Sequence, residues 1–147
     1  MVFTHCEIVC GIAEQLVAQT DLPLDADLVH VGALVHDIGV YRLYDQDGRL
    51  DHRNYIRHGV LGHEIREQKL AIPEADYPAE TIEEQLVMYA DKFHSRTTPP
   101  TFLTADSYAA HVEKLGADKG HAFDLLRARF GEPDQTSARA RYGHAQV

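Results

Sequence analysis

The chain has 147 residues, a length typical of one domain, and its 44% hydrophobic and 25% charged residues suit a single core. Its 14 basic and 23 acidic residues give a formal net charge of −9, which argues against nucleic-acid and membrane-surface partners. No segment resembles a membrane span or a signal peptide, and the two cysteines form no disulfide framework, so we expect a cytoplasmic protein. Ten histidines, several within apolar helical patterns, indicate a metal site.

Helical periodicity dominates the chain and predicts an all-α fold, a compact single-domain bundle of about five to seven helices. The first helix is expected to start at once, where Thr4 and Glu7 have the spacing of a capping box. The second is expected to follow Pro23 and to end at Gly39 as its C-cap. Apolar residues on two sides of this second helix predict that both sides are buried and that the helix is central.

Four further helices are predicted after a polar loop. They are expected at about 53–69, 81–94, 105–115 and 121–130. The polar residues that follow predict a helical domain over 1–134 and a flexible C-terminal tail over 135–147.

His36 and Asp37 stand side by side at the end of an apolar helical segment. A buried carboxylate costs several kcal/mol unless it is paired, hydrogen-bonded, protonated or bound to a metal. His5 and Asp91 supply further nitrogen and oxygen donors from two other predicted helices, and packed helices can aim such donors at one point. Asp91 lies opposite the main apolar stripe of its helix, so it faces either solvent or a second interior surface.

The order of these residues resembles the signature of the HD-domain superfamily of metal-dependent phosphohydrolases. The matching segments are Thr4-His5-Cys6, His36-Asp37-Ile38-Gly39 and Tyr89-Ala90-Asp91-Lys92. Similarity to the small bacterial members with a His-Asp-Ile-Gly motif extends to segments 55–59, 81–84, 99–102 and 130–134. The resemblance therefore covers about residues 4–134. Relatives usually carry residues ahead of the first histidine, which here is His5, so an N-terminal helix is expected to be missing.

The resemblance implies one divalent transition metal ion per chain, bound by His5, His36, Asp37 and Asp91, with positions left for water and a substrate oxygen. Two imidazoles and two carboxylates suit Mn, Fe, Co, Ni or Zn, whereas Mg and Ca prefer sites made of oxygen alone. Asp37 is also expected to be catalytic through the metal that it binds.

Other candidate residues adjoin these motifs. His58 is expected to be catalytic as a general acid or base, because histidine titrates near neutral pH. Arg57 and Lys92 are the expected substrate-binding cations. His94 is a conceivable further ligand, but its place one turn after Asp91 favours an exposed histidine at the end of a helix.

Relatives with two metal ions add a histidine and then a histidine pair before the last aspartate. His58 fits the first addition, but the segment for the pair is missing between Leu70 and Ala71, which favours a single ion. The expected function is hydrolysis of a nucleotide or another small phosphorylated metabolite. The alternative is a catalytically impaired sensor module that binds metal and ligand, while an HD-fold oxygenase would need two irons and the fuller histidine set.

Overall fold

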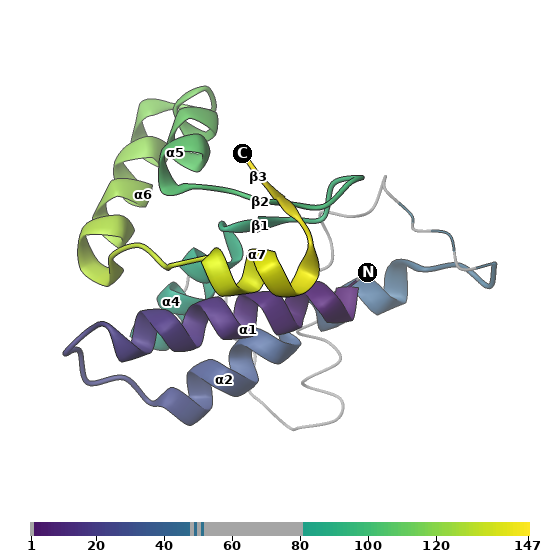
Figure 1. Ribbon diagram of the computed structural model, residues 1–147, viewed down its shortest axis with the longest axis horizontal. Coiled ribbons are helices and arrows are strands. Elements are labelled where there is room, and N and C mark those ends of the chain that lie inside the picture. Colours follow the sequence, from purple (N-terminus) through teal and green to yellow (C-terminus); the bar gives the residue numbers. More distant parts are fainter. Residues whose placement is uncertain (1, 48, 50, 52–80) are drawn as a thin grey trace.

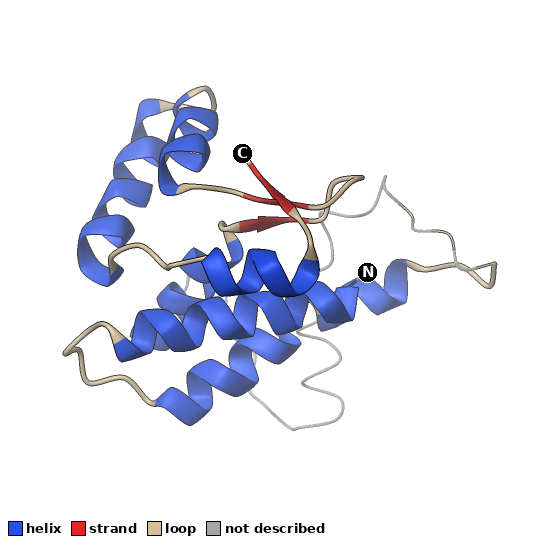
Figure 2. Cartoon of the chain, in the orientation of Figure 1, coloured by secondary structure: helices blue, strands red, loops and turns tan. Residues whose placement is uncertain are grey.

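The computed structural model describes residues 2–47, 49, 51 and 81–147. In this part of the chain there are six α-helices, one 3-10 helix and three very short strands (Figure 1). The helices are α1 (Val2–Ala18), α2 (Ala26–Val35), η1 (Ile38–Leu43, 3-10), α4 (Ile82–Asp91), α5 (Ala105–Glu113), α6 (Ala117–Phe130) and α7 (Thr136–Tyr142). The strands are β1 (His94–Ser95), β2 (Thr101–Phe102) and β3 (Ala145–Gln146). The predicted helical fold is confirmed, and Figure 2 shows how little of it is strand.

The core forms where α1, α2 and α4 pack against one another. The helix α1 buries residues on several sides, including the fully buried Val9, Ile12 and Leu16, and is therefore the central helix. The helix α2 buries only Val29 and Ala33, as expected of a helix that packs through one face.

The prediction that α2 is central was wrong for the residues that the structure describes, because Leu28 and Val31 are 53% and 56% exposed. Two apolar stripes show that a helix could be covered on both sides, but they do not show which helix lies in the middle.

None of the helices in the described ranges has the length and hydropathy of a membrane span.

The predicted helix ends are partly correct. The capping box of α4 is confirmed: the hydroxyl of Thr81 accepts from the Glu84 N–H, and the Glu84 carboxylate accepts from the Thr81 N–H. The capping box at Thr4 is wrong, because α1 already begins at Val2. Gly39 lies within η1 and so is not the C-cap of α2, which ends at Val35. The helix predicted at about 53–69 lies outside the described residues.

The three strands bring distant parts of the chain together. Strand β1 runs antiparallel to β2 and places His94 opposite Phe102, while β3 runs parallel to β2 and places Gln146 opposite Phe102. The segment 135–147, expected to be a flexible tail, thus contains α7 and β3. Its Gln135 is buried and donates a hydrogen bond to the carbonyl of Leu103. This contact could not be predicted from the polar composition of the segment. The domain boundary at 134 stays a prediction.

Candidate metal centre

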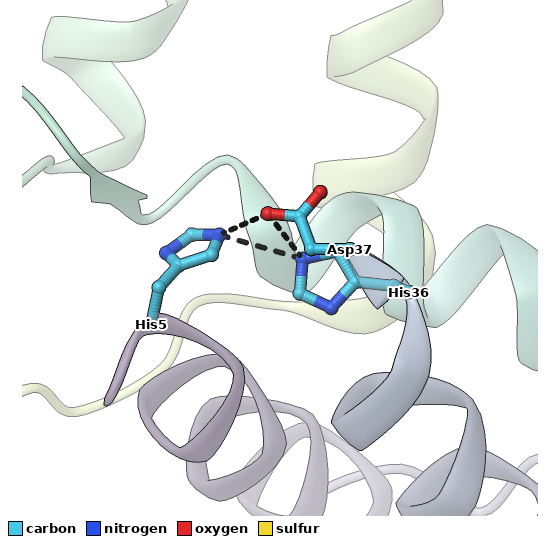
Figure 3. A group of neighbouring side chains, drawn as sticks. All are labelled: His5, His36 and Asp37. Atoms are coloured by element: carbon cyan, nitrogen blue, oxygen red, sulfur yellow. Dashed lines mark hydrogen bonds and ion pairs between the residues drawn. The ribbon is translucent and has the colours of Figure 1, made fainter. Parts of the chain in front are cut away.

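The four predicted ligands come from the ends of three packed elements. His5 lies near the start of α1, Asp91 is the last residue of α4, and His36 and Asp37 connect α2 to η1. Figure 3 shows the rings of His5 and His36 with a nitrogen of each directed towards the Asp37 carboxylate. His5 and Asp37 are almost fully buried, with 3% and 5% of their side chains exposed. The packing of α1, α2 and α4 therefore gathers donors that are up to 86 residues apart in sequence.

The ligand atoms are close enough to share one ion. Nε2 of His5 lies 3.0 Å from Oδ1 of Asp91, 3.4 Å from Nε2 of His36 and 3.7 Å from Oδ2 of Asp37. Nε2 of His36 lies 3.5 Å from Oδ1 of Asp91 and 3.8 Å from Oδ2 of Asp37. Nitrogen and oxygen ligands held about 2.1 Å from an ion lie about 3.0–3.4 Å from one another. The distances from His5 to Asp91 and to His36 fall in this range, the other three slightly exceed it, and the donor types suit a transition metal ion.

Charge is balanced within this cluster. Burial disfavours the charged form of His36, but hydrogen bonds with Asp91 and Cys6 and the nearby carboxylates outweigh it and raise the pKa of His36 to about 10. Burial would also raise the pKa of Asp91, yet its contacts with His36, His5 and Lys92 hold that pKa well below the ordinary value. Asp91 thus faces the interior cluster, the second of the two orientations that the sequence allowed.

Nδ1 of His36, the ring nitrogen that does not face the other predicted ligands, has a backbone partner. Nδ1 of His36 lies 2.7 Å from the carbonyl oxygen of Ala33. Because a carbonyl can only accept, His36 carries its proton on Nδ1 when it is neutral, and Nε2 keeps a lone pair for a metal ion.

His94 is buried, with 5% of the residue exposed, so the expectation of an exposed histidine was wrong. The chain turns after α4, and the pairing of β1 with β2 sets His94 against the ring of Phe102. Nδ1 of His94 contacts Nδ1 of His5, and Nε2 of His94 contacts Nδ1 of His144. Nε2 of His5, which faces the other predicted ligands, is not the atom that His94 contacts. Burial and the neighbouring His5 and His144 lower the pKa of His94 to about 3, so His94 is neutral near pH 7.

Two cationic side chains lie at the cluster. Nη1 of Arg96 lies 2.9 Å from Oδ2 of Asp37, as a charge pair without the alignment of a hydrogen bond. Nζ of Lys92 lies 3.0 Å from Oδ2 of Asp91; burial opposes the charged form of Lys92, but the charge of Asp91 outweighs it and raises the pKa of Lys92. Lys92 was predicted from its motif, whereas Arg96 follows a two-residue strand that leaves no periodic signal.

A cavity of about 340 Å³ adjoins the cluster. Its lining residues are Thr4, His5, His94, Arg96, Thr97, Thr98, Pro100 and His144. The predicted ligand His5 and the cationic Arg96 therefore both face this cavity. The predicted site residues Arg57 and His58 lie outside the described residues.

A second group of possible ligands, Cys10, Glu14 and His30, lies further along α1 and α2. Nδ1 of His30 is 2.7 Å from Oε1 of Glu14 and 3.4 Å from Sγ of Cys10. Burial and Glu14 raise the pKa of Cys10 to about 11, so its thiol is protonated at neutral pH. The side chains of Glu14 and His30 are also about half exposed, which makes this group the poorer metal site.

Comparison with known proteins agrees with the geometry. The chain matches the HD domain over residues 2–96, a segment that contains all four predicted ligands. A tRNA (cytidine(56)-2'-O)-methyltransferase from Picrophilus torridus is 32% identical over 110 residues, in an alignment that covers 65% of this chain and 32% of that protein. The chain spans about a third of the length of this relative. No solved structure shows a significant match. HD domains are typically metal-dependent phosphohydrolases, and the match over more than half of its length shows that the chain belongs to the HD domain family.

Proposed function

We propose that this protein is a metal-dependent phosphohydrolase that acts on a nucleotide or another small phosphoester, with one divalent transition metal ion per chain. The observation that carries the proposal is that Nε2 of His5 and Nε2 of His36 lie 3.4 Å apart and that each lies within 3.0–3.8 Å of both Asp37 and Asp91, beside a cavity. When bound there, the ion would polarise a phosphoryl oxygen and lower the pKa of a water molecule towards neutrality.

The cationic residues of the site have a role in binding phosphate. Arg96 lines the cavity and also contacts Asp37, so its guanidinium can face a phosphate that lies next to the ion. Its planar set of donors matches phosphate oxygens well. Lys92 supplies a second positive charge next to Asp91. From the resemblance, we assign phosphate binding to Arg57 as well. Because histidine titrates near neutral pH, we assign general acid–base work to His58.

The contact between Arg96 and Asp37 also favours a second candidate function. A guanidinium 2.9 Å from a ligand oxygen competes with a metal ion for that oxygen. Together with the missing histidine pair, this contact supports a sensor module that binds a metal ion and a phosphorylated ligand without efficient turnover.

Phosphate release from a panel of nucleotides and simple phosphate esters separates the two candidates. The protein would be stripped with a chelator and assayed with Mn, Co, Ni, Zn or Mg. Hydrolysis that needs added metal and falls to background in Asp37→Ala, but not in the exposed control Asp124→Ala, is the expected result. Binding of metal with no hydrolysis of any ester would favour the sensor.

A further inference from the structure

Three histidines form a chain of contacts that begins at the metal centre and ends in the C-terminal segment. Nδ1 of His5 lies 2.8 Å from Nδ1 of His94, and Nε2 of His94 lies 3.0 Å from Nδ1 of His144. The sheet sets this geometry: His94 begins β1, His144 directly precedes β3, and both strands pair with β2 (Figure 1). Both contacts have hydrogen-bond length.

A neutral imidazole has one N–H donor and one lone pair that accepts. His94 therefore accepts through one ring nitrogen and donates through the other, so the chain can run in two directions only. In the outward direction, His5 donates from Nδ1 to His94, and His94 donates from Nε2 to His144. In the inward direction, His144 donates to His94, His94 donates to His5, and His5 carries its own proton on Nε2.

Only the outward direction leaves a lone pair on the nitrogen of His5 that faces the other ligands. In the inward direction, the proton on Nε2 points to Oδ1 of Asp91, 3.0 Å away, and occupies the place of the ion. We propose that His94 and His144 are positioning residues that hold His5 in the tautomer that binds the metal ion. This inference rests on the metal site of the proposed function and deepens it.

The comparison with His36 shows why His144 is needed. The carbonyl of Ala33 can only accept, so it fixes the tautomer of His36 by itself. His94 can donate or accept at either nitrogen. It therefore fixes the tautomer of His5 only if its Nε2 donates to a partner that accepts. His144 supplies that acceptor when its Nδ1 carries no proton, and it does so from a segment that lies beyond the matched HD domain at residues 2–96. The C-terminal segment thereby becomes part of the metal centre.

The affinity of the full chain for Mn²⁺ tests the proposal, because the electron paramagnetic resonance signal of free Mn²⁺ falls as the ion binds. His94→Leu removes the partner of a metal ligand and should weaken binding about 10- to 100-fold. His144→Leu removes the partner of His94, one step further from the ion, and should weaken binding by more than twofold. In His94→Asn the amide oxygen can still accept from His5, so its affinity should stay within about threefold of the wild type. His121→Leu, at an exposed histidine of α6, is the matched control and should leave the affinity unchanged.

Nitrogen-15 NMR of the Zn²⁺-loaded wild-type chain reads the tautomers directly and needs no variant to fold. We expect protons on Nδ1 of His5 and on Nε2 of His94. A proton on Nδ1 of His94, or leucine variants that bind Mn²⁺ within twofold of the wild type, would overturn the proposal. Neither measurement involves turnover, so a chain that binds Mn²⁺ but hydrolyses no ester contradicts the proposed reaction alone.

Discussion

Oδ2 of Asp37 lies 2.9 Å from Nη1 of Arg96, and the same oxygen faces Nε2 of His5 and Nε2 of His36 at 3.7 and 3.8 Å. The guanidinium thus compensates a buried carboxylate on the side of Asp37 that a metal ion would occupy. Of the ways to compensate a buried carboxylate that the sequence left open, ion pairing is therefore supplied by Arg96.

Replacing Arg96 with glutamine should therefore destabilise the metal-free protein by about 3 kcal/mol, because it leaves the buried Asp37 charge without this partner. Urea unfolding in the presence of a chelator measures this change. Saturating Mn²⁺ should restore most of the loss, since an ion at 100 times its dissociation constant adds about 2.7 kcal/mol. Arg141→Gln, at an exposed arginine of α7, is the control, and equal stability of the two variants would contradict the role given to Arg96.

The protonation of His36 predicts how the metal-free protein responds to pH. Its pKa is about 10 in the folded chain and 6.5 for an ordinary histidine, so the proton stabilises the fold fully below pH 6.5. That stabilisation, on the order of a few kcal/mol, should be lost as the pH rises from 6.5 to about 10. Metal affinity should rise over the same window, because the ion displaces this proton.

Unfolding free energies at several pH values, measured with a chelator, check this prediction. The variant His36→Gln should lose the extra pH dependence, while His121→Gln, at an exposed site, should retain it. Parallel pH profiles for His36→Gln and the wild type would count against the charge balance described for the cluster.

The number of ions per chain follows from the missing histidine pair. We expect one tightly bound ion, because a second would have too few protein ligands. Metal analysis of protein purified without a chelator should give about one ion per chain, both for the wild type and for Cys10→Ser, which disrupts the second ligand group. Two ions per chain, or the loss of one ion in Cys10→Ser, would be inconsistent with this account.

The role proposed for His58 can be separated from metal binding. The variant His58→Ala should keep its metal content but lose about 10²- to 10⁴-fold in turnover, the usual effect of removing a general acid or base. Metal content and the rate of phosphate release, measured on the same preparation, test this. A variant that loses its ion would instead make His58 a ligand.

The sequence was sufficient to predict the helical class and to select His5, His36, Asp37 and Asp91 as one group, because residue type and order carry that information. Their convergence depends on the packing of α1, α2 and α4, and the structure supplies it. The partners of these ligands could not be predicted in the same way. Arg96, His94 and His144 are placed by two-residue strands, which are too short to show periodicity.

The position of each helix within the bundle was equally hard to predict. Apolar residues on two sides of α2 suggested a central helix, yet that place belongs to α1, whose buried residues include His5 and Cys6. Hydrophobic pattern identifies surfaces that can be buried, whereas the choice of which surface is buried depends on contacts between distant segments.

We expect one metal ion to be bound jointly by four residues: His5, His36, Asp37 and Asp91. The most direct test is a titration of chelator-stripped protein with Mn²⁺, with Asp37→Ala and the exposed control Asp124→Ala measured beside the wild type. The wild type and Asp124→Ala should each saturate with about one ion per chain, and Asp37→Ala should show no saturable binding, because it loses an anionic ligand. Equal binding by Asp37→Ala and Asp124→Ala would contradict the assignment of the site.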